Sequence, residues 1–568
     1  MVFAEYLRSD AVRSPLVLLG ADTRPTGRAI AEAMIPVLLA CGCDVSYAGV
    51  TAAPEIMAWV RSTGAVIRAV DDCACGFIYI SASHNPIGHN GLKFGLTDGG
   101  VLAAEGTAKL IENFRAFFER DDCISKIETL ISAADFRKVQ SVFAGTAAEK
   151  NNARNAYYDF CGDVAWDGST AISAALRDGL AKRPLGLVCD FNGSARTVSV
   201  DRDFFSSLGL KFDCINGEPG QIVHSIVPEG ESLDPCREFL EKTRGRDATF
   251  MLGYMPDCDG DRGNLVIWDD AANGARALEA QEVFALACVA ELSHLAWTGE
   301  LAYDGEGKVL TKAAVAVNDP TSMRIDRIAR AFGVSVFRAE VGEANVVALA
   351  RKLREEGYIV RILGEGSAGG NITHPSAVRD PVSTVLAIVK LLSVRSSAKK
   401  PGLFELWCRL SGRDYREDFG LADIIASLPG FSTTPAYSKD AILRIKTKDH
   451  AILKERYQKI FLREWEGCKN ELKTRCNFHG WEAVAYNGLE EKRGLKNFGE
   501  AGGGGLKIGF SNGEGETSAY IWMRGSATEP VFRIMADAEN PPDGKGRELE
   551  RFLLDWQRRM ITEADLVT

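Results

Sequence analysis

Short apolar runs alternate with amphipathic stretches along most of the chain. A strand-like run at residues 16–20 is followed by a helical pattern at 28–40 and a second strand-like run at 44–49. The same order returns twice, at 185–190, 200–208 and 211–215, and again at 301–304, 322–332 and 335–338. Strands that alternate with helices indicate parallel sheets covered by helices. The sequence therefore predicts three related mixed α/β domains, although it contains no repeat of short fixed period.

The C-terminal part, which follows an apolar helix expected at 382–394, has a different pattern. Residues 440–500 are charged and mostly lack a clear strand pattern, and the Gly-rich stretch 500–505 predicts a flexible surface loop. Apolar runs then predict three strands, and the last amphipathic stretch predicts a closing helix. These elements are expected at 506–510, 518–522, 531–536 and 547–563. We therefore expect a separate, smaller α+β domain at this end.

Size and charge narrow the class of protein. A chain of 568 residues is too long for one hydrophobic core, so three or four domains are expected. The net charge of −10 argues against a nucleic-acid or anionic-membrane surface. Early charges at the N-terminus and the lack of a long apolar run predict a cytoplasmic protein. The fourteen cysteines are scattered without zinc-ligand spacing, which favours reduced thiols.

A polar loop with reactive side chains follows the apolar run 76–80. Its sequence, Ser-Ala-Ser-His-Asn-Pro at 81–86, places Ser83 beside His84, and Lys93 comes one short loop later. The ends of strands are where α/β proteins expose reactive groups. Ser, Asn and Pro also favour ordinary turns, so the residues alone leave a plain turn open.

Three carboxylates, Asp257, Asp259 and Asp261, occupy alternate positions and are followed by Arg262. Hard oxygen ligands with this much negative charge suit a divalent cation. An EF-hand is excluded because Arg262 and Trp268 occupy the positions of its required Gly and Glu. An aspartyl nucleophile of the haloacid-dehalogenase type is a weaker alternative, and a solvated acidic turn without chemistry is another.

Two further segments carry chemistry suited to a phosphorylated sugar. The segment 364–370 contains Glu365 and Ser367 among glycines, which let a ligand approach the backbone. The segment 524–533 gathers two guanidiniums and two hydroxyls between predicted strands, which is equipment for a phosphate monoester. Its four candidate side chains are Arg524, Ser526, Thr528 and Arg533. Taken alone, the first segment is better explained as a plain Gly-rich turn, and a polar hairpin stays open for the second.

With these four motifs in this order, the chain resembles the α-D-phosphohexomutases, which include phosphoglucomutase and phosphomannomutase. The family's phosphoserine, metal, sugar and phosphate loops match residues 81–86, 257–262, 364–368 and 524–533, with supporting matches at 20–25 and at Arg379-Asp380. The resemblance spans about residues 16 to 540 and implies a heart-shaped architecture of four domains. The expected boundaries are 1–175, 176–297, 298–415 and 416–568.

The resemblance also implies the chemistry of each site residue. Ser83 would carry a phosphoryl group, with Lys93 as general base and His84 as a supporting acid/base, while Arg24 and Arg262 would steady the phosphoserine. Mg²⁺ would be held by the three aspartates together with phosphorylated Ser83, and hexose 1,6-bisphosphate would be the intermediate and activator. The sugar phosphate would be bound by Glu365, Ser367, Arg379, Arg524, Ser526, Thr528 and Arg533. A monomer or homodimer is expected, with no nucleic-acid or membrane partner.

Three departures from the family pattern leave the sugar open. Ala368 and Ala527 replace glycines, and Gly369 stands where phosphomannomutase-like members often carry His. Glucose, mannose or both are expected as substrates, with phosphoglucosamine mutase and phosphopentomutase as alternatives. A non-catalytic sugar-phosphate-binding relative is the alternative outside the enzymes. The intact Ser83, Lys93 and three aspartates argue against it.

Overall fold

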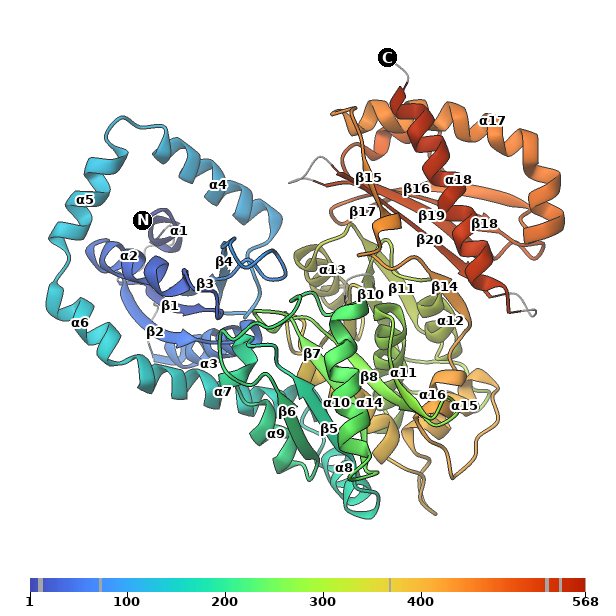
Figure 1. The fold of residues 1–568 in the computed structure, drawn as a ribbon, viewed down its shortest axis with the longest axis horizontal. Coiled ribbons are helices and arrows are strands. Elements are labelled where there is room, and N and C mark those ends of the chain that lie inside the picture. The colour runs from blue at the N-terminus through green and yellow to red at the C-terminus, as the bar shows by residue number, and fades with distance from the viewer. Residues whose placement is uncertain (9–13, 71–73, 367–368, 527–530, 541–543, 567–568) are drawn as a thin grey trace. The chain divides into compact units, whose positions relative to one another are not determined.

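The structure, a computed structural model, divides into two compact units. Unit 1 comprises Met1–Leu278 and Gly370–Arg395, and unit 2 comprises Glu279–Gly369 and Ser396–Thr568 (Figure 1). All residues are described except 9–13, 71–73, 367–368, 527–530, 541–543 and 567–568. Each unit contains more than one sheet, so the fold is a mixed α/β fold of several domains. The four domain boundaries expected from the sequence stay a prediction.

The first sheet of unit 1 has the strand order β2-β1-β3-β4. Its central strand β1 pairs in parallel with β2 and β3, and β3 pairs antiparallel with β4. Strands β1 and β3 are almost wholly buried, which explains their continuous apolar sequence. The elements of this region are α1 (Val2–Leu7), β1 (Leu16–Ala21), α2 (Gly27–Ala40), β2 (Asp44–Val50), α3 (Ala53–Val70), β3 (Cys75–Ile80), β4 (Leu92–Leu96), α4 (Ala104–Phe118), α5 (Cys123–Ala133), α6 (Phe136–Ala144), α7 (Thr146–Trp166) and α8 (Thr170–Lys182).

The second sheet of unit 1 repeats this arrangement. Its order is β6-β5-β7-β8-β9, with β5 parallel to β6 and β7 and with β7 antiparallel to β8. Helix α14, which the sequence predicted almost to the residue, packs on β7 and β8 of the same unit. The elements are β5 (Gly186–Asp190), α9 (Asp201–Ser207), β6 (Lys211–Ile215), α10 (Asp234–Arg244), β7 (Phe250–Pro256), β8 (Gly263–Asp269), β9 (Gly274–Ala277) and α14 (Pro381–Ser393). Unit 1 also contains the short strand β13 (Asn371–Thr373), which is not a strand of this sheet.

Unit 2 contains the third arrangement of this kind, in which β11, β10 and β12 lie side by side. Strand β10 pairs in parallel with both neighbours, as β1 and β5 do in their sheets. The three predicted related domains therefore share one strand pattern. The elements are α11 (Ala280–Thr298), β10 (Ala314–Asn318), α12 (Arg324–Ala331), β11 (Ser335–Ala339), α13 (Glu343–Glu355), β12 (Ile362–Gly364), α15 (Leu403–Ser411) and α16 (Leu421–Ala426).

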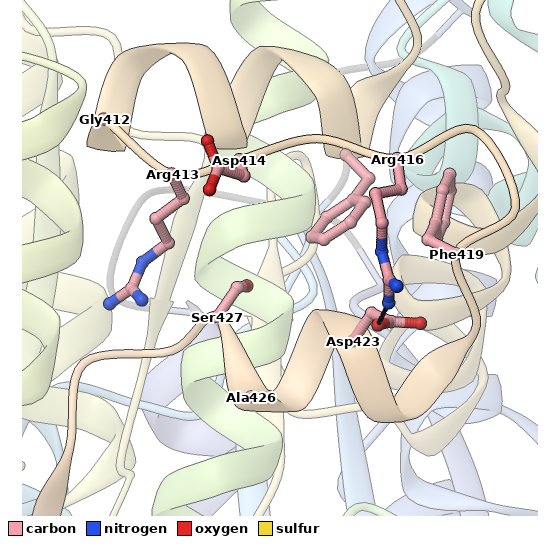
Figure 2. A pocket seen from close by; sticks show the side chains of 9 residues that line it. Gly412, Arg413, Asp414, Arg416, Phe419, Asp423, Ala426 and Ser427 are labelled. Atoms are coloured by element: carbon pink, nitrogen blue, oxygen red, sulfur yellow. Dashed lines mark hydrogen bonds and ion pairs between the residues drawn. The ribbon is translucent and has the colours of Figure 1, made fainter.

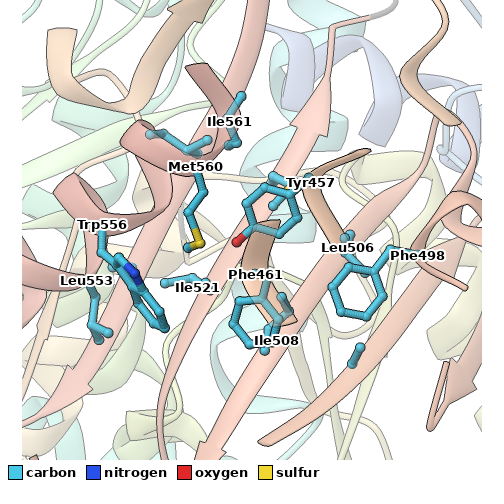
Figure 3. Packing of buried hydrophobic residues seen from close by; sticks show 14 of the residues in the cluster. Tyr457, Phe461, Phe498, Leu506, Ile508, Ile521, Leu553, Trp556, Met560 and Ile561 are labelled. Atoms are coloured by element: carbon cyan, nitrogen blue, oxygen red, sulfur yellow. The ribbon is translucent and has the colours of Figure 1, made fainter. Parts of the chain in front are cut away.

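The last sheet is antiparallel and has the order β14-β20-β19-β18-β16-β17, with β15 also on β20. Helices α17 and α18 pack on it through a buried core that includes Tyr457, Phe461, Ile521 and Trp556 (Figure 3). The elements are β14 (Phe431–Thr433), β15 (Ile442–Arg444), α17 (His450–Cys476), β16 (Gly480–Asn487), β17 (Glu490–Arg493), β18 (Gly505–Ser511), β19 (Thr517–Gly525), β20 (Val531–Glu539) and α18 (Gly546–Leu566).

Two expectations from the sequence were wrong, and one segment had been assigned no element. The run 301–304 forms no strand of its sheet, whose central strand is Ala314–Asn318. The charged segment 440–500, for which the sequence indicated only the lack of a clear strand pattern, contains the 27-residue helix α17, whose apolar residues follow helical spacing between the charges. The Gly-rich stretch 500–505 is not a loose surface loop. The buried Lys454 ammonium donates to the carbonyls of Gly502 and Gly504 at 2.8 and 2.6 Å.

The predicted reactive loops have equivalent places in the three related arrangements. The serine loop joins β3 to β4, the acidic loop joins β7 to β8, and the Gly-Glu segment begins where β12 ends. The strands that precede these loops, β3, β7 and β12, each pair in parallel with the central strand of their own sheet. Among the described residues, no helix combines the length and hydrophobicity needed to cross a membrane.

Candidate active site

The serine loop of unit 1 has a defined backbone conformation. Ser83 adopts a left-handed conformation with φ of 51°, which is uncommon for a residue with a side chain. Its amide N–H donates to Oγ of Ser81 at 2.8 Å, and that hydroxyl donates to Asp22 at 2.7 Å. A strained backbone in a reactive loop is a frequent feature of functional sites. The conformation fixes the direction of the Ser83 side chain.

Arg24 holds this loop by its backbone. Its guanidinium donates to the carbonyls of Ser83, Asn85, Pro86 and His89 at 2.5–3.0 Å, and its Nε donates to Asp22 at 3.0 Å. An arginine has five N–H groups, so these contacts account for all of them. The geometry therefore makes Arg24 a positioning residue for the serine loop, and its expected role of steadying the phosphoserine stays a prediction.

The acidic loop meets the serine loop within unit 1. Oγ of Ser83 donates to Oδ2 of Asp257 at 3.0 Å, although the two residues are 174 positions apart in the chain. Lys93, on β4, bridges the other two carboxylates, with Nζ 2.7 Å from Asp259 and 3.1 Å from Asp261. The serine, the lysine and the three aspartates predicted from separate motifs thus form one cluster.

The three carboxylates suit a divalent cation. Asp257, Asp259 and Asp261 are fully buried, and one ligand atom from each lies within 4.8 Å of the others. The Oδ1 atoms of Asp259 and Asp261 are buried without a hydrogen-bond partner in the described part of the chain. Burial of carboxylate oxygens is costly unless positive charge or donors compensate for it. A bound cation with oxygen ligands would provide that compensation.

Charges around the cluster act in opposite directions on its members. Burial, followed by repulsion from Asp259 and Asp261, raises the pKa of Asp257 well above its usual value. Burial would also raise the pKa of Asp261, but the positive charges of Lys93, Arg379 and Arg262 outweigh it, so this pKa is lowered. At Asp257, the aspartate that contacts Ser83, the positive charges of neighbouring residues therefore do not compensate fully for burial and for the other two carboxylates.

A buried arginine that the sequence did not single out supports the acidic loop. Arg196 donates to the carbonyl of Gly260 at 3.0 Å and to Asp201, Tyr157 and Asp380 at 2.8–3.3 Å. Gly260 has a φ of +72°, and a Cβ there would lie 2.4 Å from the Arg196 side chain. Arg196 carries no local motif signal because its partners lie in distant segments.

The remaining predicted residues of unit 1 lie around this cluster. Arg379 donates to Oδ2 of Asp261 at 3.3 Å, so the structure places it at the acidic loop. Arg262 is half-buried at the end of that loop, and its backbone N–H donates to Asp257 at 3.1 Å. His84 is half-buried beside Ser83.

In unit 2, Glu365 is buried at the end of β12. Its Oε1 accepts from Nδ2 of Asn318 at 3.2 Å and from the N–H of Gly342 at 2.8 Å. The next residue, Gly366, donates its N–H to Thr321 at 3.2 Å, and a Cβ at this position would lie 2.6 Å from Gln281. These contacts fix the Glu365 carboxylate. Ser367, predicted beside it, lies outside the described residues.

Two arginines of unit 2 form a concentration of positive charge. Arg524 on β19 lies directly opposite Arg533 on β20 in the antiparallel register. Nε of Arg524 is 2.9 Å from Glu340, which is the carboxylate that orients it. The backbone N–H of Ser526 donates to the carbonyl of Val531 at 2.9 Å. Thr528, the other predicted residue of this loop, lies outside the described residues.

A separate hollow of about 430 Å³ lies beside α15 and α16 of unit 2 (Figure 2). An ion pair between Arg416 and Asp423, 2.7 Å long, lies at its edge. None of its lining residues belongs to the four motifs, and Arg416 and Asp423 among them already pair with each other. The candidate site therefore consists of the motif residues and not of this hollow.

Comparison with known proteins identifies the relatives of this chain. Residues 1–120 match the family model described as phosphoglucomutase/phosphomannomutase, alpha/beta/alpha domain I, and residues 297–406 match domain III of the same family. A phosphoglucomutase/phosphomannomutase of Thermococcus kodakarensis is 26% identical over 566 residues, covering 99% of this chain and 93% of the relative. A phosphoglucosamine mutase of Lacticaseibacillus casei is 31% identical over 271 residues, covering 46% and 50%.

Solved structures agree on the fold. A phosphoglucomutase from Paramecium, pp63/parafusin, has a TM-score of 0.62 at 14% identity and covers 99% of this chain and 91% of its own. A phosphomannomutase described as putative, from Thermus thermophilus, has a TM-score of 0.57 at 18% identity and covers 99% and 93%. Fold, motifs and relatives together define an α/β enzyme of the isomerase class. The chain belongs to the α-D-phosphohexomutase family.

Proposed function

We propose that this enzyme interconverts hexose 1-phosphate and hexose 6-phosphate, with glucose, mannose or both as the sugar. The observation that carries the proposal is the 3.0 Å contact between Ser83 and Asp257, with Lys93 across the other two aspartates. It joins a hydroxyl nucleophile, a proton acceptor and a cation-binding cluster within unit 1. The serine serves as a carrier of a phosphoryl group.

The reaction consists of two phosphoryl transfers. In the first, a free hydroxyl of the sugar phosphate attacks phosphorus on phosphorylated Ser83. The new bond joins that hydroxyl oxygen to phosphorus, and the bond from phosphorus to Oγ of Ser83 breaks with its electron pair on Oγ. Lys93, after its ammonium has given up a proton to solvent, takes up the hydroxyl proton at Nζ as the neutral amine. The product is hexose 1,6-bisphosphate. After it reorients, the second transfer returns its other phosphoryl group to Ser83 and releases the isomer.

The residues around Ser83 have distinct roles. Arg24 fixes the serine loop, Arg262 and His84 contact the phosphoryl group, and Arg379 helps to balance the charge of the acidic loop. Asp257, Asp259 and Asp261 would hold Mg²⁺ together with the phosphoryl group, and the cation would offset negative charge on the group in transfer. Electrostatic positioning of this kind supplies most of the catalysis in phosphoryl transfer.

The described residues of unit 2 recognise the substrate. Arg524, Arg533 and Ser526 bind the phosphate that the sugar already carries, because guanidinium and hydroxyl donors suit its oxygens. Glu365 accepts hydrogen bonds from sugar hydroxyls that are present in both orientations of the bisphosphate. Ser367 and Thr528 keep the substrate-binding roles that the sequence predicts for them.

Phosphoglucosamine is the second candidate substrate. Several relatives bear the name phosphoglucosamine mutase, among them that of Lacticaseibacillus casei, and the relative of Methanopyrus kandleri is described as a probable phosphoglucosamine mutase. Values of kcat/KM for glucose 1-phosphate, mannose 1-phosphate and glucosamine 1-phosphate, measured with the matching bisphosphate, would rank the sugars.

The carrier role of Ser83 has a direct test. Intact-mass measurement of freshly prepared protein should find one phosphoryl group that is absent from Ser83→Ala, and that variant should lose mutase activity while keeping its circular dichroism spectrum. Ser62→Ala, a change at an exposed serine of α3, should keep both the group and the activity. Mutase activity in Ser83→Ala would rule out the assignment.

A further inference from the structure

Helices α4, α5 and α6 of unit 1 leave several large apolar side chains exposed. In Figure 1 these light-blue helices follow one another in an arc around α1 and α2. Leu110 is the single buried residue of α4, and neither α5 nor α6 has a buried residue. The exposed apolar side chains in this segment are Ile111, Phe114, Phe118, Ile124, Ile131 and Phe136, with exposures of 44–71%.

This exposure is unusual for the protein. Among the described residues, the large exposed hydrophobics include three phenylalanines, and all three lie in this segment. Phe114 and Phe118 stack on each other in solvent, with ring centroids 6.3 Å apart. Short helices are marginal alone and gain most of their stability by burying an apolar face. An exposed apolar patch of this kind marks a binding surface.

The balance of charges in this segment favours a second copy of the same chain as its partner. Residues 104–144 contain six basic and seven acidic side chains, so the segment has no excess of positive charge. Amphipathic helices that bind anionic membranes or nucleic acid carry such an excess. A nearly neutral surface with both signs can instead be complementary to itself, as a two-fold interface requires.

The pattern on α4 shows this self-complementarity. A hollow of about 540 Å³ beside the helix is lined by Ala108, Ile111, Glu112, Arg115, Ala116 and Glu119. If a second α4 runs antiparallel about the midpoint between residues 113 and 114, Ile111 faces Ala116 of the copy and Glu112 faces Arg115. Both pairs occur twice by symmetry. Neither Glu112 nor Arg115 forms an ion pair with another described residue of its own chain.

We infer that α4 forms a homodimer interface with a second copy of this chain. The two α4 helices pair antiparallel, with Glu112 and Arg115 forming reciprocal ion pairs beside the apolar stripe of Ile111, Phe114 and Phe118. This surface is separate from the motif residues, so dimerisation and mutase activity are tested independently.

Sedimentation velocity of the full-length protein over a concentration series tests the interface. The unmodified protein should dimerise, and Glu112→Arg or Arg115→Glu should each raise the dimer dissociation constant by at least about tenfold. The double variant Glu112→Arg/Arg115→Glu should recover most of the affinity, because it restores the pairs with reversed sign. Phe114→Asp should also weaken the dimer.

A matched control shows whether the effect is specific to α4. Lys473→Glu, a charge reversal at an exposed position of α17, should dimerise normally, and every variant should keep its circular dichroism spectrum and its mutase activity. A protein that stays monomeric throughout the concentration series would overturn the inference. Binding of that monomer to vesicles containing phosphatidylserine would assign the apolar surface to a membrane instead. The inference would also be overturned by a dimer that both single reversals leave unchanged, or by a double variant that stays as weak as the single ones.

Discussion

Arg524 and Arg533 face each other across two antiparallel strands, with like charges directly opposed. Like charges directly opposed destabilise a sheet, and one carboxylate offsets only part of the repulsion between two guanidiniums. Glu340 lies 2.9 Å from Nε of Arg524 and orients that side chain. An arrangement that costs stability in the free protein and gains it with a bound anion is what a phosphate site requires.

Arg533→Gln should therefore separate stability from binding. Without anions, the variant should be more stable than the unmodified protein by a few tenths of a kcal/mol to about 1 kcal/mol, because the repulsion is removed. Inorganic phosphate should raise the Tm of the unmodified protein more than that of the variant, as calorimetry would show. Arg551→Gln, at an exposed position of α18, is the control. Equal phosphate-induced shifts in the two proteins would contradict the assignment.

Asp259→Asn should weaken cation binding. The change removes one of three buried carboxylates whose ligand atoms lie within 4.8 Å of one another. Even partners behind a metal ligand contribute about 10–100-fold to affinity, so loss of a ligand should cost at least about tenfold. Isothermal titration of the metal-free protein with Mg²⁺ measures this loss, and Asp555→Asn on α18 is the control. Unchanged affinity in the Asp259 variant would place the cation elsewhere.

Arg24→Lys should lower kcat while the fold is retained. A lysine keeps the charge but cannot reproduce the bonds of the guanidinium to four carbonyls of the serine loop. A misplacement of a reacting group by about 1 Å costs about 100-fold in rate, so we expect kcat to fall by about 100-fold when the Ser83 loop loses these bonds. Steady-state kinetics should show it mainly in kcat. Arg28→Lys on the exposed side of α2 should be nearly neutral. A variant with normal kcat would mean that the loop keeps its shape without Arg24.

Lys507 should make stability depend on pH. Burial, with repulsion from Arg338, lowers the pKa of Lys507 to about 7, and its ammonium lies 4.3 Å from the ring centroid of Tyr520. The unfolded chain keeps a lysine pKa of about 10.4, so between these values unfolding takes up a proton. The contribution of Lys507 to the free energy of unfolding therefore rises with pH, by at most about 1.4 kcal/mol per unit.

Lys507→Met removes that contribution. The free energy of unfolding of the variant minus that of the unmodified protein should fall as the pH rises from 7 to 10. Urea unfolding at several pH values measures the difference, which cancels the titration of other groups common to both proteins. Lys459→Met, at an exposed position of α17, should give a constant difference. Parallel curves for the Lys507 variant and the unmodified protein would contradict the lowered pKa.

The sequence predicted most elements of the three α/β arrangements because their strands read as short apolar runs, and the inner strands β1, β3 and β5 are almost wholly buried. The prediction of a strand at 301–304 failed because this short apolar run pairs with no strand of the sheet and forms only an isolated bridge between Tyr303 and Val309. The sequence also indicated no element for α17, whose alternation of apolar and charged residues spans 27 positions. Local pattern is a weak guide where tertiary contacts decide the structure.

For the site, motif spacing identified Ser83, Lys93 and the three aspartates, which the structure brings together. It gave no signal for Arg196, because four partners from distant segments define the role of that buried arginine. It also could not distinguish a phosphate contact from a backbone contact for Arg24. Such distinctions depend on where each N–H group points, and a motif does not contain that information.

The shared position of the three reactive loops has a consequence for how such an enzyme can diversify. Each loop follows a strand whose parallel pairing is complete before the loop begins, so its residues can change without altering the sheet. Ser83, the three aspartates and Glu365 thus lie on separate loops attached to one repeated scaffold. New substrate preferences can arise by exchange within a single loop, while the other two keep their chemistry.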